Sequence, residues 1–337
     1  MRIECLAASA MRIIICKLTR SLCYAAAGFL SAVPSGAFAQ DYPIRPVTIV
    51  VPYAAGGAGD LTTRIFAQQM SQMVREPVVV LNRPGAGFGN SAGMVAQARP
   101  DGYTIFLSGN GAAIASVLFK SLPYKLSDFK DVSSIAFFGL VLLVDGDSPF
   151  KSVADLLAYA KAHPGTLNIG TVAAGSTQNL AANLFKVTCG DDMQVVPFET
   201  TSQVVSALRG GDVQAALEII SPVLGQISSK TVRALAVTSS ARFPGLPDVP
   251  TLAESGLRGY EASSWSGLSV PAGTPDAIVN KLAAQTASVL QTPEVKQKMQ
   301  MLGAQAKASS PSEMTGRVQA DTAKWKAVIE RAGISTP

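Results

Sequence analysis

Short β-branched runs alternate with segments of helical periodicity along most of this chain. Residues 47–51 form a compact apolar run typical of a buried strand, and a Gly-rich turn follows it. Residues 78–81 and 104–107 repeat the strand pattern on either side of a helix expected over 91–98. Helical spacing between the first two strands relates Leu61, Ile65, Phe66, Met70 and Met73. Repeated strand–loop–helix units predict an α/β fold, with mostly parallel sheets flanked by helices.

The same alternation begins again after Asp145. Ser152 and Asp155 have the spacing of a helix-capping box. Residues 243–260 are rich in Pro and Gly and predict a long surface connection. Further strands are expected at 167–170, 195–196, 213–220 and 232–237.

The C-terminal part of the chain is predicted to be helical. Thr274-Pro275 is expected to be a cap and first-turn pair, and Ser310-Pro311-x-Glu313 a second capping box. The restart of the pattern predicts two lobes, with residues 40–143 and 263–337 in lobe 1 and 144–262 in lobe 2. Ligands in such folds bind beyond the carboxyl ends of the strands and between domains.

The N-terminus has the three parts of a secretory signal peptide. Four basic residues come before an apolar stretch that covers 22–33, and Ala37-Phe38-Ala39 forms a cleavage signal. The prediction is a signal peptide over residues 1–39 and a periplasmic mature protein. Its removal takes four basic residues and one acidic residue from the 28 and 23 of the whole chain, which leaves a net charge of about +2.

Cysteine and histidine are too scarce for most site chemistries. Three of the four cysteines lie in the predicted signal peptide, which leaves Cys189 as the only one and His163 as the only histidine. A nucleophilic cysteine needs a base, and a zinc site usually takes several such ligands. No phosphate-loop or complete dinucleotide motif is present in the mature chain. We therefore expect no enzyme activity, no metal, no cofactor and no nucleic-acid partner.

Glycine-rich loops between predicted strands and helices are the candidate binding elements. Their backbone N–H groups are unobstructed, and the following helix adds the positive end of its dipole, so they suit a carboxylate. Asp60 also fits a helix cap, and Glu199 would repel an anion unless it were neutral or paired. Trp265 fits either the cleft or a hinge. The predicted ligand contacts are Tyr53, Ala54, Ala55, Gly56, Gly57, Asp60, Gly85, Gly87, Asn90, Asn110, Thr171, Gly175, Ser176, Thr177, Asn179, Glu199 and Thr200.

Several of these loops belong to a series of motifs that resembles one receptor family. The series covers the mature chain in order: Val50-Val51-Pro52-Tyr53-Ala54-Ala55-Gly56-Gly57-x-x-Asp60, Asn82-Arg83-Pro84-Gly85-Ala86-Gly87, Asp101-Gly102-Tyr103-Thr104, Val196-Pro197-Phe198, Leu208-Arg209-Gly210-Gly211 and Pro247-Asp248-Val249-Pro250. The chain thus resembles the Bug family, the solute-binding receptors of tripartite tricarboxylate transporters. The resemblance implies a periplasmic-binding-protein (Venus-flytrap) fold. It also implies that the loops around Gly57 and Ser176 hold a ligand carboxylate.

Two departures from the family pattern bear on the ligand. Asn179 stands where the family often has His, and Glu199-Thr200 where it often has a basic residue with Gly. Both reduce positive character, so a monocarboxylate, amino acid or amide competes with a di- or tricarboxylate. The expected partners are a small organic acid and membrane transporter subunits, with the receptor a monomer. A sensory protein that signals to a membrane kinase would use the same cleft, and an exported hydrolase remains a remote alternative.

Overall fold

A computed structural model of the protein describes residues 42–173 and 176–334. The predicted signal peptide lies outside these residues, as does Gly175. All the helices and strands below belong to the unit Pro43–Pro337.

The strands of this unit form one mixed sheet. Its spatial order is β2 (Val78–Asn82), β1 (Val47–Val51), β3 (Thr104–Gly109), β9 (Ser263–Pro271), β4 (Phe129–Asp145), β7 (Ala215–Ile219), β5 (Leu167–Val172) and β6 (Met193–Phe198), with β8 (Val232–Val237) and β10 (Ala304–Ala306) also paired to β4. Strand β1 pairs in parallel with β2 and β3, and β5 pairs in parallel with β6 and β7. The α/β fold predicted from the alternation is therefore confirmed.

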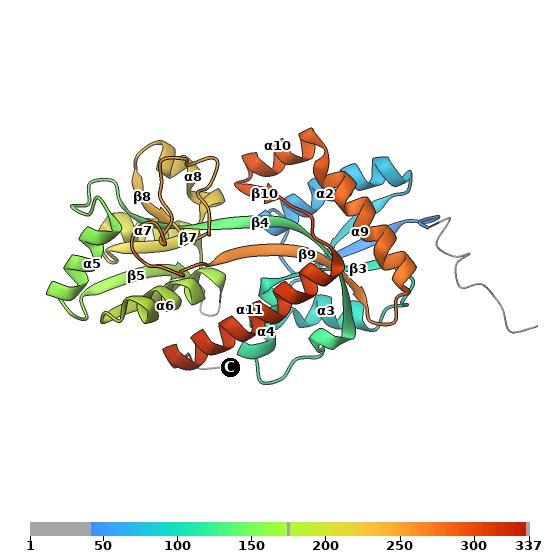
Figure 1. Ribbon diagram of the computed structural model, residues 1–337, viewed down its shortest axis with the longest axis horizontal. Coiled ribbons are helices and arrows are strands. Elements are labelled where there is room, and N and C mark those ends of the chain that lie inside the picture. Colours follow the sequence, from blue (N-terminus) through green and yellow to red (C-terminus); the bar gives the residue numbers. More distant parts are fainter. Residues whose placement is uncertain (1–41, 174–175, 335–337) are drawn as a thin grey trace, which may run out of the picture. The chain divides into compact units, whose positions relative to one another are not determined.

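Two antiparallel strands, β4 and β9, run through the middle of the sheet (Figure 1). β4 pairs with β9 from Phe129 to Gly139, and with β7 from Leu140 to Leu143. One continuous strand thus serves both halves of the sheet, and its partner changes at Gly139–Leu140. The lobe boundaries at 143 and 263 remain a prediction.

Helices flank the sheet at both ends. They are α2 (Ala58–Val74), α3 (Gly89–Ala96), α4 (Asn110–Leu118), α5 (Val153–Ala162), α6 (Thr177–Cys189), α7 (Thr201–Gly210), α8 (Ile220–Ser228), α9 (Asp276–Gln291), α10 (Pro293–Met301) and α11 (Pro311–Ala332), with short 3-10 turns η2 (Ala86–Phe88) and η3 (Leu126–Asp128). Figure 1 shows α5 to α8 around one end of the sheet and α2, α3, α9 and α10 around the other. Helix α11 contacts both α4 and α6. The capping boxes predicted at Ser152 and Ser310 are confirmed.

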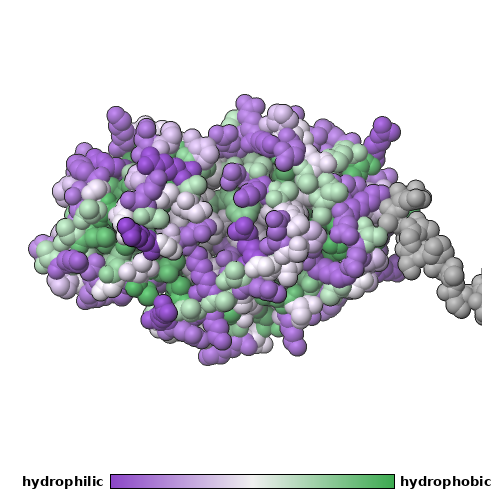
Figure 2. All heavy atoms as spheres, viewed as in Figure 1, coloured by the Kyte–Doolittle hydropathy of each residue, from purple (hydrophilic) through white to green (hydrophobic). Residues whose placement is uncertain are grey.

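Alternate side chains of β4 fill separate cores on its two faces, as the two-residue period of a strand requires. Leu140 and Leu142 pack in a core with α5, α6 and α11, whereas Val141 and Leu143 pack in a core with α7 and α8. All four are fully buried. Figure 2 shows mostly polar side chains over the visible face, with apolar ones scattered between them. No helix within the described ranges is long and apolar enough to span a membrane.

Two local predictions hold only in part, and a third is wrong. The strand expected over 213–220 ends at Ile219, because α8 begins at Ile220 and Pro222 fits its first turn. The connection expected on the surface over 243–260 buries Leu252 and Tyr260, whose apolar groups the Pro and Gly content concealed. Thr274 does not cap α9, since its hydroxyl is buried without a hydrogen-bond partner among the described residues and Pro275 holds the cap position.

Candidate functional site

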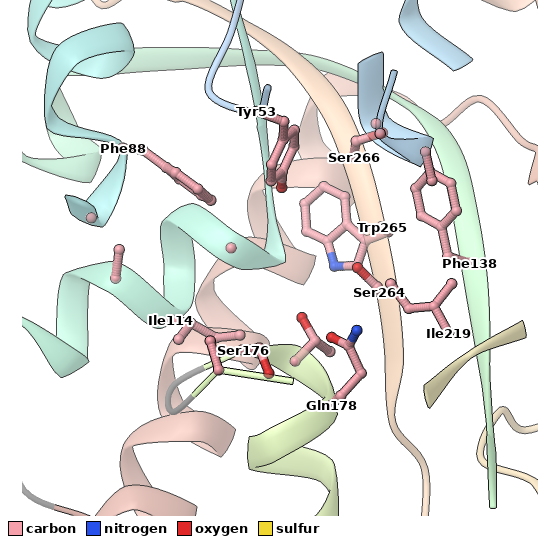
Figure 3. Close-up of a pocket in the computed structure, with 18 of the residues that line it drawn as sticks. Tyr53, Phe88, Ile114, Phe138, Ser176, Gln178, Ile219, Ser264, Trp265 and Ser266 are labelled. Atoms are coloured by element: carbon pink, nitrogen blue, oxygen red, sulfur yellow. The ribbon is translucent and has the colours of Figure 1, made fainter. Parts of the chain in front are cut away.

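A cavity of about 520 Å³ lies where the first turns of α2 and α6 meet the middle strands (Figure 3). Its lining comes from the loop after β1, from η2 and α4, from the start of α6, and from β4, β7 and β9. The lining residues are Tyr53, Ala54, Gly57, Ala58, Gly59, Gly87, Phe88, Gly111, Ile114, Ala115, Leu118, Phe119, Phe138, Ala173, Ser176, Thr177, Gln178, Ile219, Ser264, Trp265 and Ser266. Its volume is in the range of small-molecule sites.

The loop between β1 and α2 is held by a buried carboxylate. Asp60 is 1% exposed and accepts hydrogen bonds from the Gly56 amide at 2.8 Å, the Asn82 side chain at 2.8 Å and Arg64 at 3.0 Å. Asn82 also donates to the Tyr53 carbonyl at 3.0 Å. Burial alone would raise the pKa of Asp60, but the hydrogen bonds that it accepts, first of all from Arg64, outweigh burial and lower it. Asp60 therefore shapes the loop and does not line the cavity.

The first turn of α2 faces the cavity through its backbone. Gly57, Ala58 and Gly59 line it, and the first N–H groups of a helix have no partner within the helix. A side chain at Gly59 would come within 2.8 Å of the Tyr53 ring, so glycine allows that ring to lie over the helix start. The Tyr53 side chain is partly exposed, yet burial around its hydroxyl raises the pKa to about 12. Tyr53 is thus a neutral phenol in the cavity wall.

In the second predicted loop, some residues line the cavity and others bond within the loop. Gly87 and Phe88 line the cavity, and the Phe88 ring packs edge-on against Tyr53 with centroids 5.4 Å apart. The Asn90 side chain instead donates to the Pro84 carbonyl at 2.7 Å, and Gly85 packs beneath it. The structure therefore places neither Gly85 nor Asn90 in the cavity wall.

The start of α6 supplies the polar wall. Ser176 caps the helix, accepting from the Asn179 amide at 3.1 Å and donating to the Val172 carbonyl at 3.1 Å. Thr177 accepts a hydrogen bond of 2.9 Å from the side chain of Asn110. Asn110 does not itself line the cavity but joins two elements that do. The sequence interpretation had named all three residues, Ser176, Thr177 and Asn110.

Most of the remaining predicted residues lie away from the wall. Thr171 and Asn179 are buried below the start of α6 and bond to each other at 3.2 Å. Thr200 caps α7, and Glu199 lines a separate surface hollow with Phe198 and Gln203. Of the other loop residues, Ala54 lines the cavity, whereas Ala55 and Gly56 do not.

A buried acid contacts the polar wall from behind. Glu218 on β7 is fully buried, and it accepts from Thr201 at 3.1 Å and from Gln178, a cavity residue, at 3.5 Å. Its other carboxyl oxygen has no partner among the described residues. Burial raises the pKa of Glu218 to about 7, so its carboxyl group is partly neutral near neutral pH.

The apolar walls were missed by sequence reasoning, apart from Trp265, which had been assigned to either the cleft or the hinge. Trp265 is 2% exposed, and its indole N–H donates to Asp321 on α11 at 2.7 Å. The Phe137 ring stacks on the indole at a centroid distance of 6.3 Å, and the Arg317 guanidinium lies 5.9 Å from the indole centre. The missed apolar residues are Phe88, Ile114, Ala115, Leu118, Phe119, Phe138 and Ile219.

The two residues weighed for other chemistry lie elsewhere. Cys189 ends α6, about 18 Å along the helix from Thr177 at the usual rise per residue. Burial raises the pKa of the Cys189 thiol to about 12, which keeps it protonated. His163 packs against the ring of Tyr159. Among residues 42–173 and 176–334, no three His, Cys, Asp or Glu side chains are grouped to hold a metal ion.

Two helix starts converge here on one cavity, an arrangement that suits the binding of a small anionic solute. The sequence matches the family described as "Tripartite tricarboxylate transporter family receptor" over residues 62–334. Protein BugT of Bordetella pertussis is 34% identical over 298 residues, which cover 88% of this chain and 91% of BugT. This chain belongs to the tripartite tricarboxylate transporter receptor family, and the resemblance seen in the sequence is confirmed.

Two solved structures with ligands are similar over most of their length. R. palustris Rpa4515 with adipate has a TM-score of 0.75 and 33% identity, covering 87% of this chain and 99% of that one. MatC from Rhodopseudomonas palustris with bound malate has a TM-score of 0.71 and 31% identity, covering 86% and 100%. The fold of this chain is that of the periplasmic binding proteins.

Proposed function

We propose that this chain is a periplasmic receptor that captures a small carboxylate between the starts of α2 and α6 and delivers it to the membrane subunits of a tripartite tricarboxylate-type transporter. The observation that carries the proposal is the convergence of two helix N-termini on one cavity. Each presents unpaired N–H groups and a positive dipole end, and both favour an anion. The bound adipate and malate in the two related structures support the same class of ligand.

The described residues of the site support binding better than hydrolysis. The Ser176 hydroxyl is the candidate nucleophile of the site, but both of its hydrogen bonds stabilise the start of α6. Activation would need a base, and the only histidine packs against Tyr159 instead. Tyr53 and Thr177 remain available to orient a ligand. We therefore assign the receptor no catalytic step.

Thermal denaturation of residues 40–337 against a panel of mono-, di- and tricarboxylates, amino acids and amides tests the capture step. A ligand that binds only the folded state raises the melting temperature in a concentration-dependent way. We expect at least one carboxylate to do so, and its Kd then follows from calorimetry. A panel in which only uncharged or cationic solutes raise the melting temperature would contradict the proposal.

The delivery step needs an experiment in cells. Deletion of the gene should abolish uptake of the labelled ligand at concentrations near its Kd, and the full-length gene should restore it. Unchanged uptake together with a lost transcriptional response to the ligand would identify the chain as a sensor instead.

A further inference from the structure

The cavity has a polar wall and a much larger apolar one. The polar wall is the backbone of Gly57–Gly59, the start of α6 and the hydroxyl groups of Ser264 and Ser266 on β9. Apolar side chains cover most of the rest, and Figure 3 shows Phe88 and Ile114 on one side of the cavity and Trp265, Phe138 and Ile219 on the other. A ligand that fills this space must place most of its surface against carbon.

Aromatic rings dominate the apolar wall. Five of the lining side chains are aromatic, namely Tyr53, Phe88, Phe119, Phe138 and Trp265. Aromatic residues make up only 7% of the sequence, so the cavity gathers them. Rings favour edge-to-face or offset contact with another ring over contact with an aliphatic group of equal size.

None of the described residues that line the cavity carries a charge. Arg64 is bonded to Asp60 and Asn82 beside the first loop. Arg317 on α11 lies 4.8 Å from the centre of the Phe137 ring and 5.9 Å from that of Trp265, and it lines a separate hollow with Phe137 and Asp321. The ionisable side chain that contacts the polar wall is an acid, Glu218. A bound anion would repel it when it is ionised.

These observations separate one ligand charge from two. A single carboxylate is neutralised in part by the helix starts. A second carboxylate on the same ligand would reach rings, methyl groups and at most the uncharged hydroxyls of Ser264 and Ser266, with no cation among the described lining residues. An unpaired buried charge is very unfavourable. From the lining of the cavity, and resting on the proposed function, we propose that the ligand is a monocarboxylate with an uncharged aromatic body, in the class of benzoate.

Calorimetry with four acids tests this proposal. Benzoate and benzene-1,4-dicarboxylate share a ring and differ by one carboxylate, while cyclohexanecarboxylate has nearly the same size without aromaticity. Acetate carries the carboxylate without the body. We expect benzoate to bind at least about tenfold tighter than the diacid and about threefold tighter than the cyclohexane acid, with acetate weakest.

The outcomes are distinguishable. A diacid that binds as tightly as benzoate, or tighter, overturns this inference and leaves the proposed function intact. A cyclohexane acid that matches benzoate overturns the aromatic preference. If no carboxylate of any kind binds, the proposed function fails as well.

A matched variant places the preference in the wall. Phe119→Leu keeps the wall apolar and removes one ring. We expect the ratio of benzoate to cyclohexanecarboxylate affinity to fall about twofold, and the affinity for acetate to change less than the affinity for benzoate. An equal loss for all three acids would indicate general damage to the site and would contradict the aromatic contact.

Discussion

The side-chain amide of Asn110 donates a hydrogen bond of 2.9 Å to the hydroxyl of Thr177, which joins the start of α4 to the start of α6. The oxygen of the same amide accepts from the backbone of Trp265 at 3.2 Å. Asn110 and Thr177 are 1% and 8% exposed. One buried amide therefore ties together three elements that line the cavity, from segments 67 and 155 residues away in sequence.

Asn110→Ala should weaken both the fold and the binding of the ligand. The change leaves the Trp265 amide and the Thr177 hydroxyl without this partner, and an unsatisfied buried group costs about 1–3 kcal/mol. We expect the free energy of unfolding to fall by about 2 kcal/mol and Kd to rise about tenfold. Urea denaturation and calorimetry measure the two effects. Asn183→Ala, whose amide bonds only within α6 in the described contacts, is the control; equal losses in both variants would refute the bridging role.

Gly57→Val should remove binding without unfolding the protein. Gly57 has an ordinary backbone conformation, and a Cβ there would meet no atom closer than the Ala54 carbonyl at 3.7 Å. The added side chain would lie at the cavity and cover the first N–H groups of α2. We expect the apo melting temperature to stay within a few degrees and Kd to rise more than about tenfold.

The matched control for that variant is Gly225→Val, in α8 and also without close neighbours. It should change the stability by a similar small amount and leave Kd unchanged. Gly56 is unsuitable as a control, because its φ of +87° would strain any other residue. An unaltered Kd in Gly57→Val would remove the first loop from the binding site.

Glu218 should make the stability depend on pH. Its pKa is raised from 4.5 to about 7, so the folded protein binds the proton more tightly than the unfolded chain does between these values. The free energy of unfolding should therefore fall as pH rises from about 4.5 to 7, by up to about 3 kcal/mol, and stay lower above that window.

Glu218→Gln should flatten this dependence. The amide keeps an acceptor for Thr201 and carries no charge, so the variant should be more stable than the native protein at pH 8 and similar at pH 4.5. Urea denaturation at the two pH values measures it. Glu199→Gln, at an exposed position, is the control. A variant that follows the native pH curve would show that Glu218 titrates with an ordinary pKa.

Trp265 should report the ligand through fluorescence. The sequence contains two tryptophans, and the second, Trp325, lies in the core away from the cavity lining. In a Trp325→Phe background, ligand should change the emission of Trp265.

Asp321→Leu removes the acceptor of the indole N–H and should weaken binding several-fold, whereas Asp321→Asn keeps an acceptor and should bind nearly normally. Identical Kd values for both Asp321 variants would argue against this positioning role.

The elements with strong local signals were predictable from the sequence. The β-branched runs of β1 and β2 and the capping boxes at Ser152 and Ser310 specify their structure within a few residues. β4 and β9 were not predicted, since neither has a regular apolar period. Residues of β4 are buried on both faces and change partner at Gly139–Leu140, which only the assembled sheet decides.

The site was predictable at its helix starts and not at its apolar walls. Glycines before α2 and hydroxyls at the start of α6 indicate exposed N–H groups, so Gly57, Ser176 and Thr177 could be predicted from the sequence. Polar residues in the same loops, such as Asn90, bond to their own backbone, and composition does not distinguish that use. Ile114 and Phe119 have the same apolar sequence pattern as core residues. Whether such a side chain faces a cavity or a core depends on what packs opposite it, which the local sequence does not show.

A crystal structure of the protein with its tightest-binding carboxylate tests the central claim most directly. The account predicts the carboxylate oxygens within hydrogen-bonding distance of the Gly57–Gly59 amides and of the α6 start at Ser176 or Thr177. The body of the ligand should then lie against Phe88, Phe119 or Trp265. A carboxylate bound outside this cavity, or facing the aromatic wall away from both helix starts, would contradict it.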